Sequence, residues 1–244
     1  MTDIKEMLRA EMDRQGMHND DLRAGTAAII GGESRFQPKW ETGWSRTANS
    51  RIRQFFGSRV SGLSDVELDQ IKRTDRSFFN HVYGSKFAIG QSLGNIKPED
   101  GYRFRGGGLI QLTGRANYER YGDKIDVDLI SDPDRINDLE VATAVAVAYM
   151  LDRYKGGGFE GMKKAVGVSI GEPNEEKNRL YAEYKRTGEW DYKGEVTSVS
   201  SYTHSQATKD MQTALKKLGF YGGRIDGDWG PLSRAAYEQF LRST

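Results

Sequence analysis

Cysteine is absent from this sequence and histidine is rare, so carboxylates are the main candidates for acid and base chemistry. The 244 residues contain no Cys and only three scattered His, which are His18, His81 and His204. These counts exclude thiol catalysis, Fe–S clusters and disulfide scaffolds, and we expect neither a metal nor a cofactor. A pair of carboxylates is the usual equipment for cleaving a glycosidic bond.

Glu33 and Glu41 form the pair that the local sequence positions best. Glu33 follows two glycines at the expected end of an apolar helix, where unpaired carbonyl groups give partial negative charge. That field and apolar neighbours such as Phe36 oppose ionisation, so we expect Glu33 to keep its proton near neutral pH. Because Pro38 disfavours helix just before it, Glu41 is expected on a loop, free to face Glu33 across a groove. The spacing alone fits two solvated turn residues equally well.

A glycine-rich segment, YRFRGGGLIQLTGRANY at 102–118, places polar side chains near such a groove. If Ile110 and Leu112 alternate into the core, Gln111 and Thr113 point together the other way. An amide and a hydroxyl two residues apart on an extended segment suit one water molecule or two sugar hydroxyls. An ordinary glycine-rich loop ending in a helix cap is the alternative.

The elements that position these residues are predicted to be helices. Helical periodicity and cap residues indicate helices over about 3–15, 20–33, 138–154 and 174–186, with Asn19, Asp138 and Asn174 as caps and short helices on long loops between Pro38 and Gly114. The longest uncharged apolar run, Val141–Leu151, has 11 residues, whereas a membrane span needs about 20. We therefore expect a buried core helix there and no integral membrane segment. Charges near the amino terminus occupy the place of a signal peptide's apolar core, so Sec export is not expected.

A Ser- and Thr-rich stretch divides the chain into two predicted domains. Helical periodicity stops there, which predicts a catalytic domain at 1–186, a linker at 187–205 and a small domain at 206–244. The small domain is expected to be a minimal three-helix core. Its apolar residues fall at helical spacing in two groups, Met211, Leu215 and Leu218 and then Ala235, Ala236 and Phe240.

Several pieces of the sequence resemble a known enzyme family. They read AIIGGESRF, WET, RSFFNHVYG and DGYRFRGGGLIQLTGRANYERYG. Over roughly residues 20–185 they are similar to glycoside hydrolase family 19, the chitinases and the chitinase-like endolysins of phages. The resemblance implies a mainly α-helical, lysozyme-like domain with a deep groove between two lobes.

The resemblance also implies roles for individual residues. Glu33 matches the general acid, Glu41 matches the general base of endolysin-type members, and Thr113 matches the hydroxyl that helps hold the attacking water. Gln111 and Asn117 match positions that bind sugar. Family members invert the anomeric configuration, and inversion needs about 6.5–9.5 Å between the carboxylates so that a water molecule fits.

Three departures from the family pattern blur the substrate preference. Gly32 stands where the family usually has His before the acid, and Gly107 stands where Arg is common. The substrate-binding Ile-Asn-Gly-Gly stretch of the family is represented only by Ile170–Pro173. These differences argue against a true chitinase.

Charge and aromatic residues near the motifs favour an anionic glycan. Lys plus Arg (36) and Asp plus Glu (35) leave a net charge of +1, so no global attraction to nucleic acid is expected. Between Glu41 and Asp65 the only charged side chains are basic: Arg46, Arg51, Arg53 and Arg59. Peptidoglycan stem peptides carry carboxylates and chitin carries none, although a solvated helix face explains the stretch as well. Candidate sugar-binding side chains are Tyr83, Tyr102 and Arg105, with Phe104 and Tyr118 as further rings.

The C-terminal segment resembles a wall-binding module. Residues 218–231 read LGFYGGRIDGDWGP, close to the signature of the peptidoglycan-binding domain type 1, with Trp229 in its aromatic position. Asp226 and Asp228 are expected to form and cap the turn. The resemblance implies that the partner of this segment is the bacterial cell wall.

Together these features predict a monomeric, bacteriolytic endolysin of the lysozyme type that hydrolyses the β-1,4 glycan backbone of peptidoglycan with inversion. It is expected to stay in the host cytoplasm until a holin or membrane damage gives it access to the wall. Two alternatives stay open. One is a lytic transglycosylase that uses Glu33 alone, since ESRFQP also resembles that group's single-Glu motif. The other is a wall-binding protein whose hydrolase fold has lost activity.

Overall fold

The computed structural model describes residues 3–166, 175–188 and 206–223, and the single positions 225, 233, 236, 237, 239 and 240. The chain divides into two compact units, Thr2–Val196 and Thr197–Thr244. This division falls inside the predicted linker, and the assignment of each unit as a catalytic or a wall-binding domain stays a prediction. The Ile170–Pro173 stretch and the turn around Trp229 lie outside the described residues.

The larger unit is built from α-helices, as the sequence predicts. They are α1 (Ile4–Arg14), α2 (Asp20–Ser34), α3 (Asn49–Phe56), α4 (Asp65–Ile71), α5 (Asp75–Val82), α6 (Ala88–Ser92), α7 (Asp100–Arg103), α8 (Arg115–Lys124), α9 (Leu139–Arg153), α10 (Gly158–Ala165) and α11 (Glu175–Thr187), with 3₁₀ helices η1 (Gly57–Arg59) and η2 (Pro133–Asn137). In the described part of the chain the only β pairing is an isolated bridge between Gly107 and Leu112. The mainly α fold class is confirmed.

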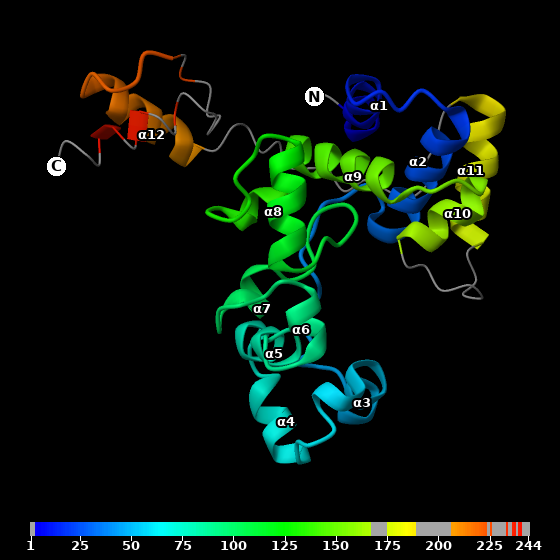
Figure 1. Cartoon of the computed structure of the whole chain (residues 1–244), viewed down its shortest axis with the longest axis vertical. Helices are drawn as coiled ribbons and strands as arrows, with labels where there is room; N and C mark the ends of the chain where they lie inside the picture. Colours follow the sequence, from blue (N-terminus) through cyan, green and yellow to red (C-terminus); the bar gives the residue numbers. More distant parts are fainter. Residues whose placement is uncertain are drawn as a thin grey trace. The chain divides into compact units, whose positions relative to one another are not determined.

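Helix α9 is the centre of the larger of two lobes in this unit (Figure 1). Its side chains enter two hydrophobic clusters, with Ala142, Ala146, Val147 and Met150 in one and Val141, Val145 and Ala148 in the other. The first cluster joins α9 to α1, α2, α10 and α11, and the second joins it to α8 and η2. A helix covered on both sides carries apolar residues around most of its circumference, which explains the uncharged run. Among the described helices, none is long and apolar enough to span a bilayer.

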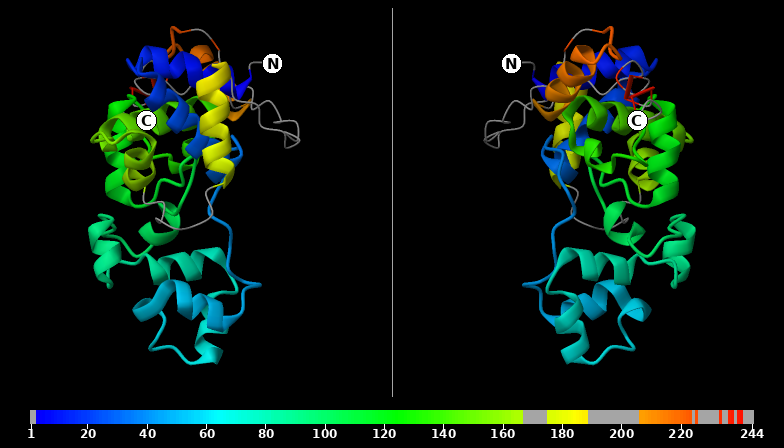
Figure 2. Two further views of the ribbon diagram at one scale, coloured as in Figure 1. Left: turned by 90° about the vertical axis from the view of Figure 1, so that its right-hand side faces the viewer. Right: turned by 90° about the vertical axis from the view of Figure 1, so that its left-hand side faces the viewer.

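The smaller lobe has a hydrophobic cluster of its own. It is formed by α3, α4, α5 and the residue that follows η1, through Ile52, Phe56, Val60, Leu68, Phe78, Phe79 and Val82. Both views in Figure 2 show these helices at the opposite end of the unit from α2 and α11. The loop between α2 and α3, which carries Glu41, runs from one lobe to the other.

Helix α2 ends within a residue of its predicted end, but the paired glycines do not terminate it. The helix begins after Asn19, whose side chain accepts the Leu22 N–H at 3.0 Å, and it continues through both glycines to Ser34. It ends where Arg35 takes a left-handed conformation with φ 55°. The glycines serve tertiary packing instead, because a Cβ at Gly31 would stand 2.6 Å from a Leu180 methyl group on α11.

Asp138 occupies the N-cap position of α9 but does not cap the helix with its side chain. Its carboxylate lies 3.5 Å from Arg135 Nε instead. The predicted start of the helix is correct, and the predicted capping contact is wrong because the ion pair takes the carboxylate.

The smaller unit contains α12 (Gln206–Lys217), whose buried face differs from the predicted one. Leu215 is 2% exposed, as expected, but Met211 is 39% and Leu218 57% exposed. Gln212 is buried in their place and donates to the Tyr221 hydroxyl at 3.1 Å and to Ser233 Oγ at 3.0 Å. The core of this unit is thus partly polar, which apolar periodicity does not reveal.

Candidate active site

The loop that carries Glu41 is fixed to the glycine-rich segment by backbone hydrogen bonds. The Glu41 N–H donates to the Gly106 carbonyl at 2.7 Å, and the Gln111 side-chain amide donates to the Lys39 carbonyl at 2.8 Å. The glycine-rich segment is closed on itself, since Gly107 and Leu112 exchange two backbone hydrogen bonds of 3.1 and 2.8 Å. Glu41 therefore has a defined position on an otherwise irregular loop.

The predicted extended conformation of this segment is wrong at Gln111. Its φ is +53°, a left-handed value that reverses the chain between Gly108 and Leu112. Alternation along a strand therefore does not orient Gln111 and Thr113. Their orientation comes from the closed turn, in which the Thr113 hydroxyl donates to the Gln111 carbonyl at 3.0 Å.

Two glycines allow close approach around Glu41. A Cβ at Gly106 would stand 3.2 Å from both Glu41 Oε2 and Gln111 Oε1, so these two side chains share the space beside Gly106. A Cβ at Gly107 would stand 2.8 Å from Trp40, Tyr118 and Ile136. Gly107 thus has no room for the Arg that is common in the family that the sequence resembles.

The Glu41 carboxylate is enclosed by donors from the small lobe. The Tyr83 hydroxyl lies 3.1 and 3.2 Å from its two oxygens. Burial raises the pKa of Glu41, and this effect is opposed by hydrogen bonds from Tyr83, Gly106 and Trp44 and by the charge of Arg59. The buried indole N–H of Trp44 makes no regular hydrogen bond within the described residues, so its effect on Glu41 is weaker than that of Tyr83. A carboxylate with a raised pKa is a stronger base once it is ionised.

The predicted sugar-binding side chains Tyr83, Tyr102 and Arg105 all make contacts within the protein. Burial, together with the Glu41 charge, raises the pKa of Tyr83, which leaves its hydroxyl a neutral donor to Glu41. The Arg105 guanidinium lies 4.0 Å from the Tyr102 ring centroid and 3.9 Å from that of Trp40, and it donates to the Tyr102 carbonyl at 2.8 Å. Arg105 is only 8% exposed. Tyr83, Tyr102 and Arg105 therefore hold the loops around Glu41 together. Direct contact with sugar stays a prediction for each of these three side chains.

Gln111, Thr113 and Asn117 form one hydrogen-bonded series. Asn117 Nδ2 donates to the Thr113 carbonyl at 2.7 Å, and Thr113 in turn donates to Gln111. The Gln111 amide donates to the Lys39 and Gly108 carbonyls, so Gln111 Oε1, Asn117 Oδ1 and the lone pairs of the Thr113 hydroxyl are acceptors that can bind water or sugar. Gln111 Oε1 lies on the Glu41 side of this series, beside Gly106.

Glu33 lies on the larger lobe, at the next-to-last position of α2. Its surroundings are not the apolar ones that we expected. The side chain is 39% exposed, and Oε1 pairs with Lys177 Nζ of α11 at 2.5 Å. Within the described residues no hydrogen bond or ion pair joins Glu33 to Glu41 or Thr113. Sequence reasoning missed Lys177, although Lys177, Leu180 and Tyr184 share one face of the helix.

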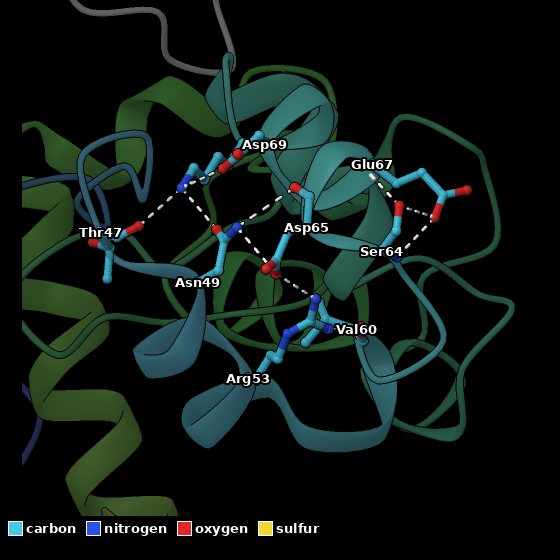
Figure 3. A network of polar contacts seen from close by, with 9 residues as sticks. Thr47, Asn49, Arg53, Val60, Ser64, Asp65, Glu67 and Asp69 are labelled. Atoms are coloured by element: carbon cyan, nitrogen blue, oxygen red, sulfur yellow. Dashed lines mark hydrogen bonds and ion pairs between the residues drawn. The ribbon is translucent and has the colours of Figure 1, made fainter.

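The basic stretch is partly neutralised. Arg53 donates to Asp65 Oδ1 at 2.8 Å and to the Val60 carbonyl at 3.0 Å, and Figure 3 shows Asn49 turned toward the same carboxylate. Arg59 stacks on Phe56, with its guanidinium 4.7 Å from the ring centroid. Arg46 and Arg51 are exposed, so they are the members of the stretch that remain accessible to an anionic polymer.

One candidate carboxylate, Glu33, lies at the end of α2 in the larger lobe, and the other, Glu41, lies on the loop that joins the two lobes. No model of a known protein family matches the chain. A protein of Haemophilus influenzae named as a glycosyl hydrolase family 19 domain-containing protein is 25% identical over 150 residues, which cover 60% of this chain and 69% of that protein. The chain is therefore similar to a family 19 glycosyl hydrolase. This similarity supports a glycoside hydrolase and agrees with the family resemblance of the sequence motifs.

Proposed function

We propose that this protein is a bacteriolytic endolysin that hydrolyses the β-1,4 bond between N-acetylmuramic acid and N-acetylglucosamine in peptidoglycan. In this proposal Glu33 protonates the leaving oxygen, and Glu41, with the Thr113 hydroxyl, activates the attacking water. The proposal extends the glycosyl hydrolase similarity to one polymer and one stereochemical course. The enzyme would wait in the host cytoplasm until a holin-type release.

The observation that carries the proposal is the setting of Glu41. Its carboxylate is partly buried and hydrogen-bonded by Tyr83, and burial raises its pKa. Carboxylates with raised pKa values in partly enclosed positions are typical of acid and base residues. The loop that carries Glu41 joins the two lobes, whereas Glu33 ends a helix of the larger lobe. Carboxylates on separate supports suit inversion, which needs room for one water molecule between them and the sugar.

Two further features support the cell wall as the substrate. Arg46 and Arg51 are exposed in a stretch that contains no acid between Glu41 and Asp65, and stem peptides offer carboxylates to such cations. The sequence at 218–231 resembles a peptidoglycan-binding signature. A tethered binding module raises the concentration of the catalytic unit at the wall without any new contact in the active site.

The test is clearing of permeabilised Gram-negative cells by the purified full chain, followed by mass spectrometry of the released muropeptides. We expect clearing by the wild type, reducing-end products, and loss of clearing in Glu33→Gln and in Glu41→Gln. Anhydro ends together with an active Glu41→Gln variant would identify a lytic transglycosylase. Sedimentation with walls without clearing would identify a binding protein that lacks activity.

A further inference from the structure

Helices α2 and α11 pack closely because two positions of α2 lack side chains. A Cβ at Gly31 would stand 2.6 Å from Leu180, and a Cβ at Gly32 would stand 2.4, 2.8 and 3.2 Å from three stem carbons of Lys177. Contacts shorter than 3.0 Å essentially never occur for real Cβ atoms, since van der Waals repulsion is steep there. The stem of Lys177 therefore fills the space that any side chain at position 32 would need.

This packing aims the Lys177 ammonium at Glu33. Nζ lies 2.5 Å from Oε1, and the Lys177 side chain is only 12% exposed although lysine is normally one of the most exposed residues. The second oxygen of Glu33, Oε2, has no hydrogen-bond partner within the described residues. Lys177 thus holds one oxygen of the Glu33 carboxyl group in a fixed direction.

We propose that Lys177 is a positioning residue for Glu33 in the reaction proposed above, and that Gly32 admits it. The inference rests on the proposed role of Glu33 as the general acid. A carboxyl group at a helix end has three rotatable side-chain bonds and needs a fixed direction before it can donate to a leaving oxygen. Displacement of a catalytic group by about 1 Å costs about a hundredfold in rate, so a fixed cation at one oxygen has a large effect.

The decisive variants keep the stem of Lys177 and change its charge. Lys177→Met preserves an unbranched chain over Gly32, and Lys177→Arg preserves the cation. We expect Lys177→Met to lower kcat by about 10- to 100-fold with KM changed by less than about twofold, and Lys177→Arg to restore most of kcat. Gly32→Ala should also lower kcat, because the alanine Cβ displaces the stem of Lys177.

Lys185 offers a matched control on the same two helices. Its ammonium pairs with Asp21 of α2 at 2.6 Å, at the opposite end of that helix from Glu33. Lys185→Met therefore removes an ion pair between α11 and α2 without touching the proposed acid. We expect its kcat to equal that of the wild type and both Lys→Met variants to have similar melting temperatures.

The outcomes separate this inference from the proposed function. Loss of kcat in Lys177→Met, rescue in Lys177→Arg and no effect in Lys185→Met support the positioning role. If Glu33→Gln is inactive but Lys177→Met keeps kcat within about threefold of wild type, the positioning role is refuted and the proposed function stands. Equal losses in both Lys→Met variants would also refute it. If Glu33→Gln is as active as wild type, both the acid assignment and the role of Lys177 fall.

Discussion

The Tyr83 hydroxyl lies within hydrogen-bonding distance of both carboxylate oxygens of Glu41, at 3.1 and 3.2 Å. Tyr83 packs against the core of the small lobe, whereas the backbone of Glu41 is bound to Gly106 of the glycine-rich segment at 2.7 Å. The proposed base is thus fixed from two sides. Its ionisation depends on this arrangement, because the hydrogen bond from Tyr83 lowers the pKa of the partly buried carboxylate.

Tyr83→Phe is expected to shift the acidic limb of the pH profile. Burial raises the pKa of Glu41 and the Tyr83 hydrogen bond lowers it, so loss of the hydroxyl raises this pKa further. A general base works in its ionised form, and the rise of kcat/KM with pH should therefore occur at higher pH in the variant. The measurement is kcat/KM against pH, with Tyr121→Phe as control, since the Tyr121 hydroxyl donates to Asp152 on α9. An acidic limb unchanged by Tyr83→Phe would contradict the role of the hydroxyl.

Glu41→Gln is expected to stabilise the fold at neutral pH while abolishing activity. The folded-state pKa of Glu41 lies above its ordinary value because of burial. The stability linked to such a group is full below the unfolded-state pKa and is lost as the pH rises through the folded-state pKa. The variant should therefore melt higher than wild type at pH 7, by about 2–4 °C for each kcal/mol gained, and the difference should shrink toward acidic pH. Thermal melts across pH test this, and a lower melting temperature at pH 7 would contradict it.

Gly107→Ala is expected to destabilise the larger unit. The new Cβ would stand 2.8 Å from Trp40, Tyr118 and Ile136, and overpacking of this kind costs about 1–3 kcal/mol. Gly62→Ala is the matched control, because nothing lies within 4 Å of a Cβ at that turn position. Denaturant unfolding should give a lower midpoint for Gly107→Ala than for Gly62→Ala. Equal midpoints would contradict the prediction, because they would mean that the side chains around Gly107 move aside at no cost in stability.

Asp100→Asn is expected to cost far more stability than Asp65→Asn. Asp100 is 0% exposed, receives two Arg115 hydrogen bonds of 2.9 Å and accepts two backbone N–H groups. Burial alone would raise the pKa of Asp100, but the hydrogen bonds from Arg115 and the backbone lower it overall. Breaking a buried pair costs about 3–5 kcal/mol, whereas the exposed pair of Asp65 with Arg53 contributes little because water and salt screen it.

The same buried pair has a defined pH dependence. A lowered folded-state pKa gives stability that is present above the unfolded-state pKa and is lost as the pH falls through the folded-state pKa. The difference in the free energy of unfolding between wild type and Asp100→Asn should therefore become smaller at acidic pH. A constant difference from neutral pH into strong acid would contradict the pairing.

Helices could be predicted where the signal comes from residues close together in the sequence, such as a cap residue or an apolar repeat. Asn19 starts α2 by a contact three residues along the chain, and the apolar run of α9 indicates burial directly. The end of α2 was predicted to within a residue, but the role of its two glycines was not. Glycine is a common helix terminator, whereas these two glycines make room for Leu180 and Lys177. Burial of Gln212 in α12 was missed for the same reason, since its partners lie up to 21 residues away.

The sequence predicts which residue types make up the candidate site, but it does not predict which side chains contact the two carboxylates. Pro38 predicted that Glu41 lies on a loop, and the glycine-rich segment was predicted to lie near the same groove. The partners of the two carboxylates are distant in sequence, 42 residues for Tyr83 with Glu41 and 144 for Lys177 with Glu33. Periodicity carries no information on such pairs. A lysine on the buried face of a helix, in register with Leu180 and Tyr184, is the one local sign of the second pair.

The configuration of the newly formed reducing end tests the two-carboxylate mechanism most directly. Wall glycan digested in an NMR tube should first show the α-anomer, because water activated by Glu41 attacks the β-linked sugar from the face opposite to the proton donor Glu33. The β-anomer as the first product, or an anhydro end without a reducing end, would contradict the account.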